Sequence, residues 1–232
     1  MRFGLVYDFR NPAQWRKPWA EVYASLMDQI AFADELGFDS IWLTEHHFVE
    51  DGYTPSPVPL MAAIAARTKR VQISTDILIL PLYHPVKLAE DIATVDVLSN
   101  GRAMLGVGSG YRDAEFAAFG TSRKERASRM EEGVAVLRGC WADGPFSFAG
   151  RHFRVTEIAR TATQSRTPSL LAVERRCSPM RAVPSGMCSL RSVQRDTATL
   201  ECRVVPSGSD VVKTIDDQTV RADLRRATRI AR

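Results

Sequence analysis

The amino-acid sequence alternates short apolar runs with longer amphipathic segments over about its first 140 residues. The short runs predict buried strands at residues 2–7, 38–43, 71–80 and 103–107. Segments with apolar residues at helical spacing follow these strands, at residues 19–36, 57–68, 85–98, 113–119 and 124–140. Gly37 follows the first of these segments, and prolines stand near the start of the second and third, as expected at helix ends. The pattern therefore predicts four successive strand–helix units.

This alternation predicts an α/β fold with a parallel sheet, because parallel neighbours need a crossover connection. Two architectures fit the pattern, a doubly wound open sheet and a (βα)8 TIM barrel. In both, functional groups lie beyond the carboxyl ends of the strands. The residues that follow the predicted strands are polar, aromatic or glycine-rich, and they are residues 7–9, 44–48, 75–76 and 108–112. We expect these four clusters to converge on one site.

Charge and aromatic content divide the chain into two portions. Residues 1–159 carry 17 Lys and Arg against 20 Asp and Glu, whereas residues 160–232 carry 14 against 7. All 19 aromatic residues lie at or before Phe153. Because aromatic side chains usually dominate a core, we predict a folded part over residues 1–158 and an Arg-rich tail over residues 159–232 that buries little. Weak helical periodicity at residues 211–232 allows a surface helix there.

The sequence also excludes several classes of protein. No run approaches the roughly 20 apolar residues that span a bilayer, and the N-terminus lacks the pattern of a secretion signal. The four cysteines match neither a disulfide-rich domain nor paired zinc ligands. We therefore expect a cytoplasmic protein with reduced thiols, no membrane partner and no metal site.

Three of the clusters after the strands contain candidate chemistry. His46 lies in a Glu-His-His run that fits either a solvated loop or a general acid–base site, and adjacent histidines seldom bind one metal ion together. Asp76 interrupts an apolar strand, so its carboxylate is expected to face the site or to lie just past the buried region. Gly106, Gly108 and Gly110 form GxGxG rather than the dinucleotide pattern GxGxxG. This spacing favours a turn that brings backbone close to a flat ligand.

Several linked motifs resemble the bacterial luciferase-like monooxygenase family. They are ELGFDSIWLTEHHF at residues 35–48, STDILILPLYHPVKLAEDIATVDVLSNGR at 74–102, and LGVGSGYRDAEFAAFG at 105–120. The resemblance runs from residue 1 to about residue 158. It implies a (βα)8 TIM-type barrel and oxidoreductase chemistry with reduced FMN and O2, or with coenzyme F420 in some branches. The implied partners are a small organic substrate and a flavin reductase that supplies reduced flavin.

The resemblance also implies roles for particular residues. His46 matches the active-site histidine of the family. The cofactor-binding positions are Thr75, Asp76 and Ile77 in the third strand, which support the flavin ring, and Gly108, Ser109 and Tyr111 after the fourth. In relatives the third strand often contains a non-prolyl cis peptide, which here would join Asp76 to Ile77. Residues 144–155 resemble a β-hairpin that the family carries after the fourth helix.

The second half of the family's barrel has no counterpart in the sequence after residue 158. Residues 168–173 predict a fifth strand, but no glycine-rich phosphate-binding turn or further strand–helix rhythm follows. We therefore expect an incomplete barrel of four to five units with an unpaired edge, a tendency to form homo-oligomers, and weak or no FMN binding. Two further functions stay open: a catalytically inactive remnant or interaction subunit, and nonspecific polyanion binding through the tail. We do not expect specific nucleic-acid binding, because the 13 arginines of the tail have no aromatic residues among them.

Overall fold

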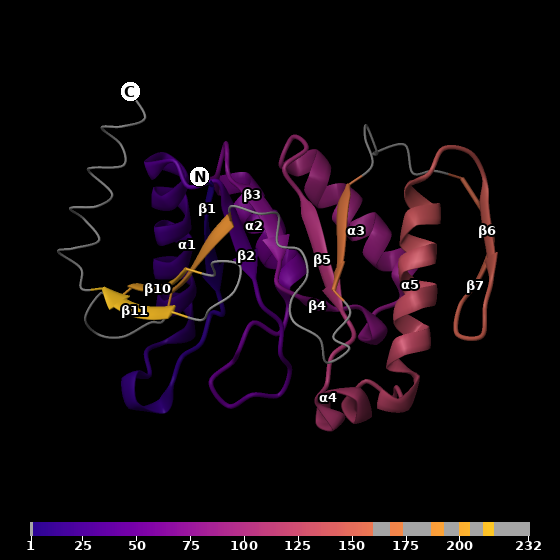
Figure 1. Cartoon of the computed structure of the whole chain (residues 1–232), viewed down its shortest axis with the longest axis horizontal. Coiled ribbons are helices and arrows are strands. Elements are labelled where there is room, and N and C mark those ends of the chain that lie inside the picture. Colours follow the sequence, from indigo (N-terminus) through magenta and orange to yellow (C-terminus); the bar gives the residue numbers. More distant parts are fainter. Residues whose placement is uncertain (1, 160–167, 174–186, 193–199, 205–210, 216–232) are drawn as a thin grey trace.

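The computed structural model describes residues 2–159, 168–173, 187–192, 200–204 and 211–215 (Figure 1). Its strand–helix units follow the predicted order. They comprise β1 (Arg2–Tyr7), α1 (Trp19–Leu36), β2 (Ser40–Leu43), α2 (Pro57–Arg67), β3 (Gln72–Thr75), β4 (Leu78–Ile79), α3 (Pro85–Leu98), β5 (Met104–Gly108), α4 (Asp113–Ala118) and α5 (Arg126–Trp141). The ends of β1, α1 and α3 coincide with the prediction, and the others differ by a few residues except in the third strand. Gly37 ends α1 in the left-handed conformation, with φ of 92°.

The prediction of one continuous third strand is wrong. Residues 71–80 form two strands, because the backbone changes direction at Asp76 and Ile77, which are joined by a cis peptide bond. β3 pairs with β2, whereas β4 pairs with β5. The cis bond that the family resemblance implies at this position is thereby confirmed.

The parallel strands form an open arc rather than a closed barrel. β1, β2 and β3 are neighbours in one sheet, and β4, β5 and β8 (Ser169–Val173) form a second. The pairing Leu5–Ile41–Ile73 continues through a bridge from Ile73 to Ala103, so β3 lies beside the start of β5. Among the described strands, β8 and β11 each pair on one side only. The fold is therefore α/β of the TIM-barrel type and incomplete, as predicted, and β8 provides the predicted fifth strand.

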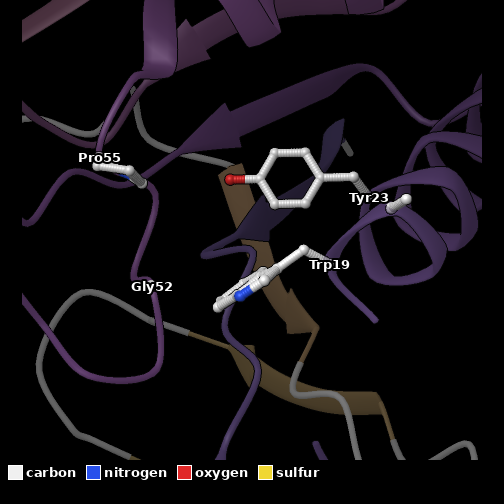
Figure 2. A pocket seen from close by; sticks show the side chains of 5 residues that line it. Trp19, Tyr23, Gly52 and Pro55 are labelled. Atoms are coloured by element: carbon white, nitrogen blue, oxygen red, sulfur yellow. The ribbon is translucent and has the colours of Figure 1, made fainter. Parts of the chain in front are cut away.

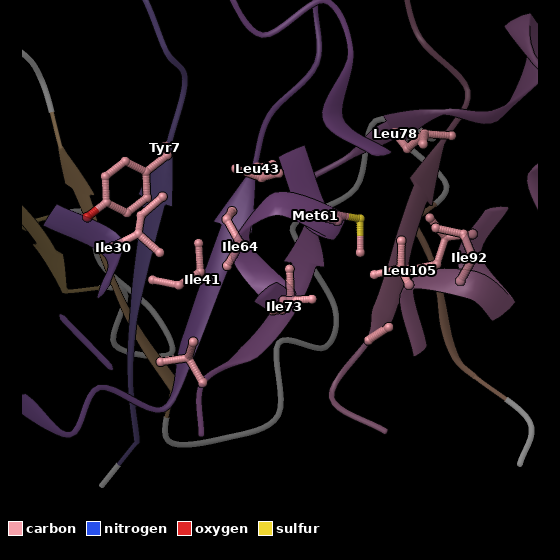
Figure 3. Close-up of a cluster of buried hydrophobic side chains, with 14 of the residues drawn as sticks. Tyr7, Ile30, Ile41, Leu43, Met61, Ile64, Ile73, Leu78, Ile92 and Leu105 are labelled. Atoms are coloured by element: carbon pink, nitrogen blue, oxygen red, sulfur yellow. The ribbon is translucent and has the colours of Figure 1, made fainter. Parts of the chain in front are cut away.

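The core lies between this arc and the helices that cover it (Figure 3). Ile41, Ile73 and Leu105 project from β2, β3 and β5 and are fully buried. Ile64 of α2 and Ile92 of α3 pack against them. These side chains hold successive strand–helix units in register, which fixes the relative positions of the loops at the strand ends.

A buried carboxylate joins α1 to the turn before β3. Asp34 accepts hydrogen bonds from the backbone N–H groups of Lys69, Arg70 and Val71, at 2.8, 2.9 and 2.7 Å. Burial acts to raise the pKa of Asp34, but these donors outweigh it and hold that pKa below its ordinary value. The charged form of Asp34 therefore stabilises the connection between the first and third strands.

The predicted hairpin lies outside α5, as Figure 1 shows, and consists of β6 (Phe146–Ala149) and β7 (Arg154–Ile158), which are antiparallel. Glu132 of α5 accepts the backbone N–H groups of Arg151, His152 and Phe153, at 2.8 to 3.1 Å. The ring centroids of His84 and Phe153 lie 5.8 Å apart, in an edge-to-face arrangement. The hairpin is thus attached to the side of α5 rather than to the strand ends.

Among the described strands, the expected unpaired edge is present at β8 but not at β1, and the surface helix expected in the tail is not formed at residues 211–215. The edge of β1 is not unpaired, because β9 (Met187–Ser192) pairs with it in parallel, and β10 (Leu200–Val204) and β11 (Val211–Ile215) continue the sheet in antiparallel order. Val211–Ile215 forms a strand rather than the start of a helix, and residues 216–232 lie outside the described residues. The misjudged helix rested on periodicity alone, and strand pairing decided the conformation instead.

Candidate active site

The ends of the parallel strands converge, as the sequence predicts. The Thr44 N–H donates to the Tyr7 carbonyl at 3.1 Å, and the Asp76 N–H donates to the Leu43 carbonyl at 2.7 Å. The loops that follow β1, β2 and β5 gather at the lower edge of Figure 1, where α4 also lies. This edge is the carboxyl end of the sheet, where function is expected in such folds.

His46 stands at the centre of this edge. Its Nδ1 lies 2.9 Å from Oε1 of Glu115, and its Nε2 lies 3.4 Å from the hydroxyl of Tyr111. The imidazole sits between the rings of Tyr53 and Tyr111, with centroid distances of 4.8 and 5.6 Å. The structure thus brings His46 and Tyr111 together, although 65 positions separate them in the sequence.

Glu115 of α4 holds the His46 imidazole through Nδ1. The sequence analysis did not identify Glu115. The side chain of Glu115 is 1% exposed, and its Oε1 also accepts the His47 backbone N–H at 2.9 Å and Nη1 of Arg112 at 3.2 Å. Its Oε2 is buried without a hydrogen-bond partner among the described residues. The position of α4 directly after the glycine-rich strand end was the available signal, because it places the first turn of the helix against the site.

This geometry assigns different functions to the two nitrogens of His46. A carboxylate accepts hydrogen bonds only, so a neutral imidazole beside ionised Glu115 carries its proton on Nδ1. Nε2 is then the acceptor nitrogen, and it faces the exposed Tyr111. Such an imidazole can take a proton from a reacting group or return one.

Glu45 and His47, the neighbours of His46 in the sequence, are both buried. The solvated-loop interpretation of the Glu-His-His run is therefore wrong for these two residues. Glu45 accepts the Ile79 backbone N–H on Oε2 and the Tyr83 hydroxyl on Oε1, and its Oε1 lies 3.1 Å from Nε2 of His47. Burial, and then the negative charge of Glu45, raises the pKa of the Tyr83 phenol far above its ordinary value. Glu45 therefore fixes the segment after the cis peptide to the end of β2.

The predicted cofactor residues of the third strand differ in their availability. The Thr75 side chain is fully buried, and its hydroxyl donates to the Gly106 carbonyl at 2.6 Å and accepts the Gly106 N–H at 3.0 Å. Thr75 therefore supports neighbouring groups through the position of its backbone. Asp76 is exposed and Ile77 is half-buried, so both are accessible at the edge of the sheet.

Two glycines of β5 are required by contacts within the chain. A Cβ on Gly106 would lie 2.1 Å from the Thr75 carbonyl oxygen, and one on Gly108 would lie 2.3 Å from Cδ1 of Ile77. Close approach between β5 and the cis segment thus accounts for both positions without a ligand. Ser109 and Tyr111 follow at the partly open end of the strand.

The described residues lack two other kinds of feature. They contain no group of three or more His, Cys, Asp and Glu side chains placed to hold a metal ion. No helix within them is long and apolar enough to cross a membrane. Cys140 is a free thiol, whereas the side chains of the other three cysteines lie outside the described part of the chain.

Comparison with known proteins places this geometry in a family. The model of the family described as luciferase-like monooxygenase matches residues 1–176, which extends past the predicted limit at residue 158. An F420-dependent glucose-6-phosphate dehydrogenase of Amycolatopsis mediterranei is 37% identical over 139 residues, covering 57% of this chain and 42% of the relative.

Solved structures show the same similarity. The monooxygenase RslO1 from Streptomyces bottropensis superposes with a TM-score of 0.66 and 33% identity, over 74% of this chain and 53% of that one. The oxygenating constituent of 3,6-diketocamphane monooxygenase of Pseudomonas putida, solved with FMN, shares the fold at 22% identity, with a TM-score of 0.65 over 74% and 51% of the two chains. The chain spans about half or less of the length of these relatives. It belongs to the luciferase-like monooxygenase family, whose members are flavin- or F420-dependent oxidoreductases.

Proposed function

We propose that this chain carries the catalytic edge of a luciferase-like oxidoreductase, which uses reduced FMN and O2, or F420, on a small organic substrate. The observation that supports this most strongly is the orientation of His46. Its Nδ1 is held by the buried Glu115, and its Nε2 is turned toward the accessible edge of the sheet. This arrangement suits an acid–base group beside a redox cofactor.

The residues around His46 fit the ring of such a cofactor. A flat ring requires an aromatic side chain for stacking, closely approaching backbone and polar groups at its edge. Tyr111 offers a ring that is 62% exposed, the backbone at Ser109 lies at the partly open end of β5, and Oε2 of Glu115 is a buried acceptor without a partner among the described residues.

In this proposal Thr75, Asp76 and Ile77 hold one side of the ring, and Gly108, Ser109 and Tyr111 hold the other. Thr75 acts through its backbone, because its hydroxyl is bonded to Gly106. When bound, the cofactor would supply the redox chemistry, as electron donor in the case of reduced FMN or as electron acceptor in an F420-dependent dehydrogenation. The chain itself binds and orients the ring and limits the access of water.

His46 is the proposed catalytic residue, and Glu115 is its positioning residue. His46 takes up or releases one proton at Nε2. Glu115 keeps the neutral imidazole in the tautomer that has its proton on Nδ1 and none on Nε2. Nη1 of Arg112 lies 3.2 Å from Oε1 of Glu115 and helps to hold this carboxylate in place.

Similar proteins support the proposed cofactors. F420 is supported by the 37% identical dehydrogenase, and FMN by the monooxygenase solved with FMN, which is similar in fold. With FMN, a flavin reductase would supply the reduced cofactor. A second copy of the chain is a candidate for covering the open strand edges, and we place the division between the barrel portion and the tail at residue 158.

Titration of the purified chain with FMN and with F420, followed by cofactor fluorescence, tests this proposal. We expect saturable binding of one cofactor, with FMN weaker than micromolar. His46→Gln should retain cofactor binding but lose most cofactor-dependent turnover, whereas His84→Gln, at the exposed start of α3, should leave both unchanged. Near-normal turnover in His46→Gln would exclude the proposed role of His46, and absence of saturable binding would favour an inactive remnant.

A further inference from the structure

A hollow lies between the start of α1 and the loop that follows β2. It has a volume of about 510 Å³ and is lined by Trp19, Ala20, Tyr23, Gly52 and Pro55 (Figure 2). None of these residues belongs to the proposed catalytic or cofactor-binding set. A hollow of this volume is in the range that holds small-molecule ligands.

Two aromatic rings from successive turns of α1 form one wall. Trp19 and Tyr23 lie four residues apart, with ring centroids 6.3 Å apart and an angle of 71° between their planes. Behind Tyr23 the buried ring of Phe9 packs at 4.9 Å. The Tyr23 ring is thus supported from behind, and the two rings present aromatic surface in two orientations.

A glycine packs against the Trp19 ring. Gly52 has φ of 72°, and a Cβ at this position would lie 2.2 Å from Cη2 of Trp19. Any other residue here would displace the indole ring. The loop is fixed on either side of the glycine, because the Asn11 N–H donates to the Asp51 carbonyl at 2.8 Å and the Thr54 N–H donates to the Asp8 carbonyl at 3.0 Å.

The lining determines the chemistry of the ligand. None of the five residues is a carboxylate, amine or guanidinium, so nothing in the wall compensates a charge on the ligand. In Figure 2 the Tyr23 hydroxyl points away from α1, toward the side of the hollow where Pro55 lies. Burial raises the pKa of the Tyr23 phenol, so the hydroxyl stays protonated and can donate a hydrogen bond.

We propose that this hollow is a binding site for an uncharged, planar aromatic or heteroaromatic molecule, which packs on Trp19 and accepts a hydrogen bond from Tyr23. The site does not depend on the proposed catalytic function. The loop nevertheless joins the two regions, because the Tyr53 carbonyl accepts the His46 N–H at 3.2 Å and its ring lies against His46.

Two probes of nearly the same shape test the hydrogen bond. Quinoline carries one acceptor nitrogen and is neutral at pH 7.5, whereas naphthalene has no acceptor. In ligand-observed NMR titrations of the full chain, we expect both probes to bind saturably and quinoline to bind about two- to tenfold more tightly, which corresponds to one net hydrogen bond. Tyr23→Phe should abolish this difference while naphthalene affinity is retained.

Variants test the location of the site. Trp19→Ala should weaken both probes by at least about tenfold, since it removes one aromatic wall. The matched control is Phe32→Ala, which removes an exposed aromatic ring elsewhere on α1 and should leave both affinities unchanged. Trp19 is itself 43% exposed, so Trp19→Ala is expected to keep the far-UV circular dichroism of the chain. Equal binding by Trp19→Ala and the unsubstituted chain, or no saturable binding of either probe, would overturn the proposal.

Discussion

Removal of the buried Glu45 carboxylate tests the organisation of the strand ends most severely. Glu45 is fully buried in its side chain and has three partners: the Ile79 N–H, the Tyr83 hydroxyl and the His47 imidazole. Glu45→Ala leaves these groups without their acceptor in a region that water does not reach. Glu45→Gln keeps one carbonyl oxygen and adds an amide donor, so it preserves part of the network.

The expected loss of stability follows from these contacts. A buried donor left without an acceptor costs about 1–3 kcal/mol, and breaking a buried charged network costs about 3–5 kcal/mol in total. We therefore expect Glu45→Ala to lower the free energy of unfolding by about 3–5 kcal/mol. For Glu45→Gln we expect a loss of about 1–2 kcal/mol, because one strong acceptor remains.

Equilibrium urea unfolding, followed by tryptophan fluorescence, measures these losses, since Trp42 and Trp141 are buried reporters. Asp91→Ala is the matched control, because it removes a carboxylate whose ion pair with Lys87 is on the surface. That control should leave the unfolding curve unchanged. If Glu45→Ala unfolded at the same urea concentration as Asp91→Ala, the buried network would not stabilise the strand ends and the reasoning would be refuted.

Three further results are expected. The charged form of Asp34 stabilises the fold above its ordinary pKa of about 4, and this contribution is lost as the pH falls through the lowered folded-state pKa. Urea unfolding should therefore show that Asp34→Asn lowers the free energy of unfolding by about 1–3 kcal/mol at pH 7. The difference should be smaller below about pH 4. Gly106→Ala should lower the midpoint of thermal unfolding more than Gly108→Ala does. The new Cβ at position 106 meets the Thr75 backbone, whereas that at position 108 meets the movable end of the Ile77 side chain. Equal midpoints would contradict the close packing of β5. FMN titration should give an affinity weaker than micromolar, and a tighter value would show that the chain supplies its own phosphate site.

Much of the fold could be predicted because the helices and strands are amphipathic in a regular way. Val22, Leu26 and Ile30 repeat at helical spacing and are all buried in α1. The rule that parallel strands present their carboxyl ends together was enough to place His46 near Tyr111. Local periodicity and strand order therefore located both the core and the edge that carries the site.

Other features depend on contacts that a single sequence does not display. The run from residue 71 to residue 80 remains apolar and β-branched through the break, so its pattern is that of one strand, and only the family resemblance indicated the cis bond. Glu115 is an ordinary polar position by spacing, and its importance comes from the packing of α4 beneath His46 and His47. Thr75 was expected at a cofactor, but its hydroxyl is bonded to the neighbouring strand.

The tail shows the same limit in another form. The sequence of residues 211–215 does not distinguish a weak helix from a strand, because five residues with two adjacent valines satisfy either pattern. Pairing of β11 with β10, which in turn pairs with β9 beside β1, decides the conformation. Such pairing is a property of the sheet and not of the segment.

The tautomer of His46 is the most direct measure of the proposed site. Two-dimensional ¹H–¹⁵N NMR of the imidazole, recorded at a pH where the ring is neutral, distinguishes a proton on Nδ1 from one on Nε2. We predict a proton on Nδ1 in the unsubstituted chain, held by Glu115, and a shift toward the mixed tautomers of a free imidazole in Glu115→Ala. A proton on Nε2 in the unsubstituted chain, or a spectrum that Glu115→Ala leaves unchanged, would contradict an imidazole positioned to exchange a proton at the edge of the sheet.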